Sequence, residues 1–408
     1  MKKDETAASI LWKSIRGLFF LPFWHAQKLR RRDMNVWLFG SWFGQKYSDN
    51  SRAMYEYLLA NEPDITPMWI TRNPKVYDRL KSMGRPVQMA DSAEGISWCR
   101  KAGVVFVTTT PDEMNSRYLN GARFVWLWHG MPLKQIMADE AKFLKGKQSL
   151  FKRFKVRLNH FLFPYDNCVP HDWVMNSADF FCPFFASAFE VPESQVWTDG
   201  YPRNDALFEE GHEDIIRRYR EKYPTAKFII YMPTHRVNAL KGTPFNGFEG
   251  FGFDADRFNR VLEEQDYVFF NKGHFFDSGA GVKVSGERFV NVTDDDYDNL
   301  YSFVKDMDLL ITDFSSIYFD YIMLGKPIVT APFDYDDYLK NERPLYFDYS
   351  RWGATRANNW DELFAILENR SYREPDRVEM ELFHNNLDGN SCKRITEHLR
   401  SELCLKKR

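Results

Sequence analysis

Short apolar runs alternate along the chain with stretches whose apolar residues recur at helical spacing, and this alternation constrains the fold most strongly. In the first half such runs end near Phe39, Thr71, Thr108 and Trp128. A strand with one solvated face alternates apolar and polar residues, whereas a parallel strand covered on both faces is apolar throughout. The pattern therefore predicts a parallel sheet that carries helices on both faces.

A second series of the same kind begins after residue 205. Its predicted strands are residues 227–232, 267–271, 289–292, 308–312 and 327–330. Its predicted helices lie near residues 213–222, 255–264, 296–304, 316–324 and 360–370. The turn-rich stretch 200–205 (GYPRND) between the two series is typical of a hinge. We therefore predict an α/β protein with two doubly wound lobes, whose ligands bind in a cleft at the carboxyl ends of the strands.

A length of 408 residues suits two domains and a short extension. We expect an N-terminal basic and apolar segment with possible membrane contact over residues 1–33, one lobe over 34–205 and the other over 206–408. The five cysteines form no CxxC pair, which favours a reducing compartment over a disulfide framework or a structural zinc site. The net charge of −2 argues against a polycation that binds nucleic acid.

Two histidines follow predicted buried strands, one in each half of the chain. His129, with Gly130 after it, follows the run that ends at Trp128, and His274 follows the strand 267–271 in the sequence NKGH. Histidine is the usual general base near neutral pH, and two such residues on facing lobes could converge on one substrate. The alternatives are a histidine that only caps its strand and a histidine on the surface.

A third candidate site lies between a strand and a helix, in the sequence Thr312-Asp313-Phe314-Ser315-Ser316. Hydroxyl groups and N–H groups at a helix start can bind an anion such as a phosphate. The alternative is an ordinary serine N-cap. Asp320, four residues after Ser316, lies on the same helix face. It could bind a nucleotide hydroxyl or support the loop.

No convincing metal motif is present. There is no HExxH sequence, and Asp334-Tyr335-Asp336 is a DxD pattern too short to be specific. The acidic run 294–296 precedes a predicted helix and is typical of capping charge. We therefore expect a site without a metal ion and without another cofactor.

The segment 142–157 carries seven basic residues and no acidic residue, together with several aromatic residues. This combination favours contact with an anionic membrane surface over a nucleic acid or a merely solvated helix face. The apolar run 18–24 is too short to span a membrane. It is either an interfacial anchor or a hydrophobic helix packed on the body of the protein.

Several motifs, in their order and spacing, resemble those of the CDP-glycerol glycerophosphotransferases, the family that makes wall teichoic acids and related capsule polymers. The resemblance covers about residues 34–398. It rests on WLFGSWFGQKYSDNS (37–51), WHGMPLK (128–134), TDGYPRND (198–205), YMPTHR (231–236), NKGH (271–274), ITDFSSIYFDYIMLGKPIV (311–329) and LDGNSCKRI (387–395).

The resemblance implies a GT-B-like fold and the transfer of an alditol phosphate from a CDP-alditol to an acceptor hydroxyl, with release of CMP. The C-terminal lobe would hold the donor, CDP-glycerol or CDP-ribitol. The N-terminal lobe would hold a lipid-linked or oligosaccharide acceptor. With a lipid-linked acceptor, we expect a cytoplasmic protein on the inner face of the cell membrane, and the near-neutral charge favours no nucleic-acid partner.

Residue by residue, the resemblance makes His129 the catalytic base and His274 the second essential histidine. Near His274 the match is imperfect, because Lys272 stands in the place of an arginine and Phe275 follows where proline is usual. Ser315 and Ser316 match phosphate binders. The full set of expected substrate-binding residues is Gly130, Lys134, Arg203, Arg236, Lys272, Thr312, Asp313, Ser315, Ser316 and Asp320.

Two other classes of function fit part of the pattern. A GT-B glycosyltransferase would use a nucleotide sugar and release a nucleoside diphosphate instead of CMP. A non-catalytic scaffold of a polymer-assembly complex would tolerate replacement of both His129 and His274.

Overall fold

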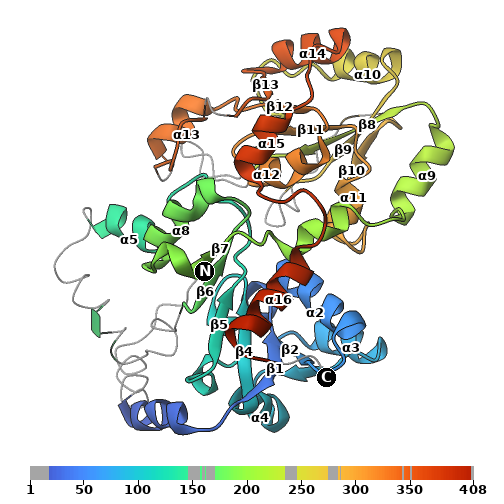
Figure 1. The fold of residues 1–408 in the computed structure, drawn as a ribbon. Helices are drawn as coiled ribbons and strands as arrows, with labels where there is room; N and C mark the ends of the chain where they lie inside the picture. The colour runs from blue at the N-terminus through green and yellow to red at the C-terminus, as the bar shows by residue number, and fades with distance from the viewer. Residues whose placement is uncertain are drawn as a thin grey trace, which may run out of the picture.

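The computed structural model describes residues 18–145, 157–158, 161, 171–234, 246–273, 284, 286–341, 344–349 and 352–405. These residues form two α/β lobes, one above the other in Figure 1, each built on a parallel sheet. The predicted fold of two doubly wound parallel-sheet lobes is confirmed.

The N-terminal lobe contains a seven-stranded sheet with the order β3-β2-β1-β4-β5-β6-β7, and every pairing is parallel. Its strands are β1 (Asp33–Phe39), β2 (Thr66–Thr71), β3 (Val87–Met89), β4 (Ala102–Val107), β5 (Arg123–Trp126), β6 (Trp173–Met175) and β7 (Val196–Trp197). Its helices are α2 (Asp49–Asn61), α3 (Pro74–Ser82), α4 (Ala93–Lys101), α5 (Met137–Lys145) and α8 (Cys182–Phe189).

The C-terminal lobe contains a six-stranded parallel sheet with the order β10-β9-β8-β11-β12-β13. Its strands are β8 (Lys227–Met232), β9 (Tyr267–Asn271), β10 (Phe289–Asn291), β11 (Leu309–Thr312), β12 (Ile328–Thr330) and β13 (Thr355–Arg356). Its helices are α9 (Asp214–Lys222), α10 (Ala255–Glu264), α11 (Leu300–Val304), α12 (Ile317–Tyr321), α13 (Tyr335–Asn341), α14 (Trp360–Asn369) and α15 (Arg377–Phe383). The 3-10 helix η7 (Pro202–Leu207) joins the lobes.

Strand β8 illustrates why these strands are apolar throughout. Phe228 and Ile230 belong to a buried cluster that also includes the N-terminal core, whereas Ile229 and Tyr231 belong to a second cluster with Trp360. Successive strand residues point to opposite faces. Both faces of the sheet are therefore covered, as the sequence pattern predicted.

The site is positioned by the order of the strands. In both sheets the chain changes direction at a central pair, β1 and β4 in one lobe and β8 and β11 in the other. At such a switch point the connections diverge to opposite faces and leave a crevice at the carboxyl ends of the strands. The candidate residues His129 and Asp313 follow β5 and β11 at these ends.

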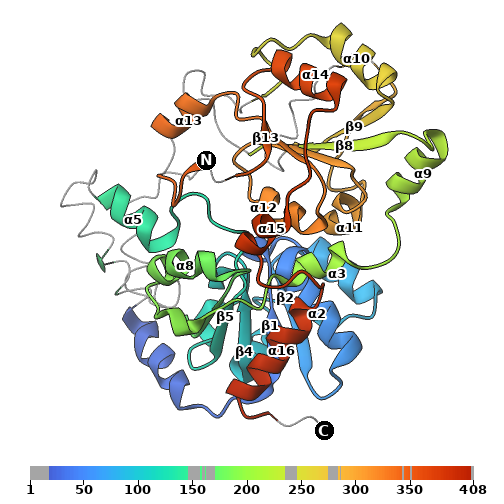
Figure 2. The ribbon, with the colours of Figure 1, turned by 45° about the horizontal axis from the view of Figure 1, so that its top comes forward.

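The helix α16 (Ser391–Glu402) lies on the N-terminal lobe beside α2, in both Figure 1 and Figure 2. The Arg400 guanidinium donates to Glu62 and Asp64 there, and the N-terminus of α16 is capped by Asp205. The boundary expected from the sequence puts all of residues 206–408 in the C-terminal lobe, whereas in the structure α16 packs on the N-terminal lobe, where its buried arginine pairs with Glu62 and Asp64.

The N-terminal segment forms a helix over residues 18–26. Trp24 is buried against the body, whereas Phe19 is 81% exposed and Leu29, just after the helix, is 89% exposed. The helix thus packs on the protein by one face and presents apolar side chains on another. Among the described residues, no helix is both long and apolar enough to span a bilayer.

Candidate active site

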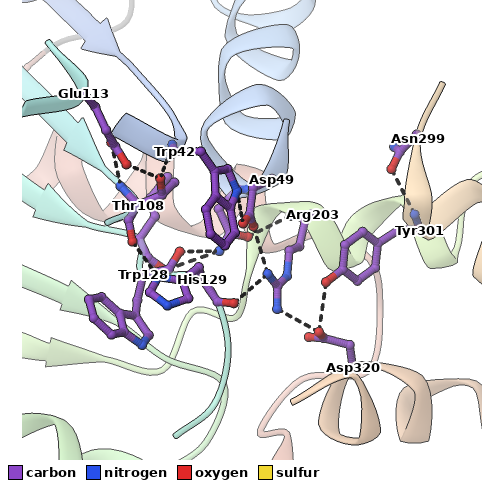
Figure 3. Close-up of polar contacts among 12 residues, drawn as sticks. Trp42, Asp49, Thr108, Glu113, Trp128, His129, Arg203, Asn299, Tyr301 and Asp320 are labelled. Carbon is purple, nitrogen blue, oxygen red and sulfur yellow. Dashed lines mark hydrogen bonds and ion pairs between the residues drawn. The ribbon is translucent and has the colours of Figure 1, made fainter. Parts of the chain in front are cut away.

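His129 lies where the chain leaves β5, and its ring is fixed by a backbone carbonyl. The His129 Nδ1 atom is 3.0 Å from the Thr108 carbonyl oxygen (Figure 3). A carbonyl oxygen only accepts hydrogen bonds, so Nδ1 carries the proton of the neutral ring and the lone pair is on Nε2. In this tautomer Nε2 can accept a proton, as a general base must.

The buried carboxylate of Glu113 fixes that carbonyl. Glu113 accepts hydrogen bonds from the N–H groups of Thr108 (3.0 Å) and Thr109 (2.7 Å), and from both threonine hydroxyls. Burial raises the pKa of Glu113, although these hydrogen bonds oppose the shift. Four donors on one carboxylate hold the end of β4 in a single conformation. The position of the Thr108 carbonyl, and with it the position of the His129 ring, is therefore fixed.

The loop after β1 places an indole beside the imidazole. The centres of the Trp42 and His129 rings are 5.5 Å apart, and Trp42 Nε1 donates to Asp49 at 3.1 Å. Trp42 and Phe43 have φ angles of 46° and 59°, a left-handed conformation that costs about 1–2 kcal/mol per non-glycine residue. Such backbone strain gathers at functional sites, where the surrounding contacts hold it in place.

Arg203, on the 3-10 helix η7, connects the two lobes at this point. Its Nη1 donates to Asp49 (2.8 Å) and to the His129 carbonyl oxygen (3.0 Å), and its Nη2 donates to Asp320 (2.7 Å). Tyr301 of α11 donates to the same Asp320 oxygen at 2.9 Å. Of the two roles that the sequence left open for Asp320, this geometry favours support of the loop.

Gly130 brings the loop of His129 against the C-terminal lobe. A Cβ atom on Gly130 would lie 2.5 Å from Ser316 Oγ, and the φ angle of Gly130 is 148°. Only glycine combines this backbone conformation with so close an approach. The structure therefore brings together the first and third sites that the sequence indicated.

In the Thr312–Ser316 segment, two residues support the fold and two are partly exposed. Asp313 accepts from the Thr234 N–H at 2.7 Å, and the Thr312 hydroxyl donates to the Met232 carbonyl at 2.7 Å, so both join the ends of β11 and β8. Ser315 and Ser316 are partly exposed. Ser316 occupies the N-cap position of α12, yet its hydroxyl makes no capping hydrogen bond.

Two lysines of the expected set lie at the edges of this region. The Lys134 ammonium is 5.3 Å from the centre of the Tyr338 ring, which in turn stacks on Phe314 at 3.6 Å. The Lys272 ammonium pairs with Asp294 at 3.0 Å. Asp294 also pairs with Lys46 of the N-terminal lobe, with 2.9 Å between the ammonium nitrogen and the carboxylate oxygen. This ion pair links the two lobes.

The model of the family described as CDP-Glycerol:Poly(glycerophosphate) glycerophosphotransferase matches residues 23–401. The chain belongs to this family. The resemblance seen in the motifs is confirmed, and so is the prediction that the protein is an enzyme of the glycerophosphotransferase class.

Among curated glycerophosphotransferases, the teichoic acid glycerol-phosphate transferase of Staphylococcus aureus is 27% identical over 382 residues, 89% of this chain and 92% of that protein. The teichoic acid poly(glycerol phosphate) polymerase of Bacillus spizizenii is 23% identical over 391 residues, 90% of this chain and 92% of that protein. The polymerase of the same description from Staphylococcus epidermidis is 27% identical over 322 residues, 76% of this chain. The chain spans 42% of the length of that last relative.

Solved structures show the same fold. A variant of the wall teichoic acid polymerase TagF superposes with a TM-score of 0.72 at 21% identity, over 98% of this chain and 99% of that one. A UDP-N-acetylglucosamine 2-epimerase superposes with a TM-score of 0.51 at 12% identity, over 93% and 98%. The predicted GT-B-like arrangement of the glycerophosphotransferase is therefore confirmed at the level of the fold.

Some predicted features of this family member lie outside the described residues. These are His274, Arg236 and most of the basic segment 142–157. Within the described part of the chain, no group of three or more His, Cys, Asp and Glu side chains is placed to hold a metal ion.

Several residues that build this candidate site were not predicted from the sequence. Trp42, Asp49, Thr108 and Tyr301 bond to, or pack against, predicted residues, and Glu113 acts one step further away, because it accepts from Thr108 and Thr109. One signal was available. A run of three threonines ends a buried strand, and a glutamate follows three residues later. A carboxylate at this distance can accept hydrogen bonds from the threonine N–H and hydroxyl groups.

Proposed function

We propose that this chain transfers glycerol phosphate, or another alditol phosphate, from a CDP-alditol to an acceptor hydroxyl and releases CMP. The observation that carries the proposal is the contact between Gly130 and Ser316. The loop of the candidate base lies against Ser316, one of the two serines to which we assign the donor phosphates. The glycerol-phosphate and ribitol-phosphate enzymes among the relatives support the reaction class.

The reaction needs a base on the acceptor side. The acceptor oxygen forms a bond to the phosphorus that carries the alditol, and the bond from that phosphorus to the bridging oxygen of CMP breaks. The acceptor hydroxyl loses its proton, for which Nε2 of His129 has the required lone pair. The neutral tautomer is held by Thr108, so the base needs no rearrangement before it acts.

The donor side must offset the charge of a diphosphate. Ser315 and Ser316 offer hydroxyl groups at the start of α12, and we assign the donor phosphates to them. We assign supporting positive charge to His274, Arg236 and Lys272, which the family resemblance marks in the same lobe. Charge that develops on the departing CMP oxygen is stabilised by such groups.

The proposal is tested by incubating the purified protein with CDP-glycerol or CDP-ribitol, together with candidate acceptors, and following CMP release. Release of CMP with one of the two donors supports the transfer, and the preferred donor identifies the alditol. Turnover of nucleotide sugars with release of a nucleoside diphosphate would show that the reaction is glycosyl transfer instead of alditol-phosphate transfer. A protein that binds polymer but releases no nucleotide would act as a scaffold.

Replacing Ser315 and Ser316 together by alanine is expected to weaken the binding of CMP and of the CDP-alditol in parallel, because both ligands lose the same hydroxyl donors. Isothermal titration calorimetry measures both dissociation constants. The matched control is Ser92→Ala, since the Ser92 hydroxyl accepts from Gly95 N–H at 2.9 Å as an ordinary cap of α4. The control should lower stability by about 1 kcal/mol and leave CMP affinity unchanged. Equal CMP affinity in the double variant would remove the phosphate assignment.

We further propose that the enzyme works in the cytoplasm at the inner face of the cell membrane, where a lipid-linked acceptor would be presented. The basic segment 142–157 supplies charge, and the exposed Phe19 and Leu29 supply apolar surface. Each cation near an anionic bilayer contributes about 1 kcal/mol, so a few in reach give reversible binding.

Binding to anionic vesicles is therefore expected to be sensitive to salt, because the surface potential is screened over about 10 Å at 0.1 M salt. In flotation assays the protein should rise with anionic vesicles at low salt and separate from them at high salt. A variant with Lys152, Arg153, Lys155 and Arg157 replaced by glutamine should stay at the bottom, yet turn over a soluble acceptor analogue. If that variant floats like the wild type, the segment is not the anchor and residues 18–32 become the next candidate.

A further inference from the structure

We infer that Arg203 is a positioning residue that fixes the base loop of His129 on helix α12, and not a residue that binds substrate. The inference rests on the proposed function, because it concerns how the acceptor-side base is held against the donor-phosphate segment. It changes the role that the sequence resemblance gave to Arg203, and it adds Asp49 and Tyr301 to the working parts of the site (Figure 3).

The guanidinium of Arg203 lies among acceptors from both lobes. Both terminal nitrogens donate, to Asp49 and the His129 carbonyl from Nη1 and to Asp320 from Nη2. The side chains of Arg203, Asp49 and Asp320 are only 6%, 7% and 2% exposed. The aromatic rings of Tyr201 and Tyr301 lie 5.4 and 5.0 Å from the guanidinium carbon. The guanidinium is thus enclosed by protein, with its terminal nitrogens already engaged.

These contacts tie the base loop to α12 at two points. Gly130 touches Ser316 at the start of the helix, and Arg203 joins the His129 carbonyl to Asp320. Ser316 and Asp320 are four residues apart and therefore lie on one face, about one turn from each other. The loop is laid along the first turn of α12, so these two contacts together set the separation between His129 and the proposed phosphate site.

Arginine suits this place for a physical reason. Its planar guanidinium reaches three acceptors in fixed directions, whereas lysine offers a point charge that cannot span them. Burial acts to lower the pKa of Arg203, but the carboxylates of Asp320 and Asp49 outweigh it and hold the pKa well above its usual value. Because the group stays charged, removal of the guanidinium would leave two buried carboxylates without their positively charged partner.

The experiment compares Arg203→Lys with wild type in the CMP-release assay and in calorimetry with CMP. A displaced base is expected to lower kcat by roughly a hundredfold, the scale of a misplacement of about 1 Å, while the dissociation constant for CMP changes by less than about threefold. A parallel rise in the CMP dissociation constant with little change in kcat would instead make Arg203 a substrate-binding residue. An unchanged kcat would also overturn the inference.

The matched control is Arg400→Lys. Arg400 is equally buried at 6% exposure and also bridges two carboxylates, Glu62 and Asp64, but it contacts neither His129 nor α12. It should lower the melting temperature without lowering kcat per folded molecule. If Arg203→Lys does not fold, Asp320→Asn keeps the shape of the side chain, removes the negative charge that pairs with Arg203, and should lower kcat by roughly tenfold.

A readout independent of activity separates this inference from the proposed function. The Nδ1–H resonance of His129, assigned by its loss in His129→Ala, should shift in the spectrum of Arg203→Lys and stay in place in Arg400→Lys. A wild type that releases no CMP while this resonance shifts as expected would overturn the proposed reaction and leave the positioning role standing. An unshifted resonance in Arg203→Lys would overturn the positioning role, whatever the reaction.

Discussion

Replacing His129 by alanine is expected to lower the rate of CMP release by about two to four orders of magnitude, the usual contribution of a positioned acid or base. The acceptor alcohol is a weak nucleophile at neutral pH, and the lone pair on Nε2 that accepts its proton would be lost. Donor binding should persist, because Ser315 and Ser316 are unchanged. Steady-state kinetics should therefore show the loss in kcat, with circular dichroism unchanged.

The matched control for this change is His171→Ala. His171 lies in the same lobe, and its Nδ1 likewise faces a backbone carbonyl, that of Phe189, at 2.9 Å. Its loss should leave turnover of the folded enzyme near the wild-type value. His274→Ala should fall in the same range as His129→Ala. Near-normal CMP release from either variant would end the catalytic assignment of that histidine.

Gly130→Ala is expected to lower turnover by roughly a hundredfold although it adds only one methyl group. The new Cβ would lie 2.5 Å from Ser316 Oγ and 3.5 Å from Arg203 Nη2, and alanine does not tolerate a φ angle of 148°. Either the base loop or α12 must move, and a displacement of about 1 Å between reacting groups has this effect on rate. Both kcat and CMP affinity should fall, because the new methyl group would displace Ser316, to which we assign the donor phosphates.

Gly211→Ala separates the steric effect from the backbone effect. Gly211 also has a positive φ angle, 93°, but a Cβ there meets nothing within 4 Å. This control should cost stability alone, which a thermal melt would record. If Gly130→Ala turns over like Gly211→Ala, the closeness of the two loops has no part in catalysis.

The fold could be predicted from the sequence where the strands are long and buried. Strands β8 and β9 occupy the residues predicted for them, because four or five consecutive apolar residues between turns have few other interpretations. The strands β7 and β13 have two residues each, too few for any pattern to appear. The predicted helix 296–304 begins only at Leu300, after the Asn299 cap, because the acidic residues before it form a turn that bonds to the other lobe.

The candidate site could be predicted only in part, and the limit is physical. His129, Ser315 and Ser316 follow strand ends, a position that a linear pattern can reveal. The partners of Arg203 are Asp49 and Asp320, which are 154 and 117 residues away in the chain. Only the packing of two lobes brings these charges together, and no local spacing encodes it. The same holds for Tyr301.

The return of α16 to the N-terminal lobe has a consequence for the order of synthesis. The C-terminal lobe is inserted between the sheet of the N-terminal lobe and the helix that completes it, so the first lobe to leave the ribosome is the last to be finished. Until α16 emerges, the surface beside α2 lacks Ile395 and Leu399, and Glu62 lacks Arg400. Nascent chains of this architecture would pass through a stage in which apolar surface beside α2 is exposed, and a chaperone can recognise such surface.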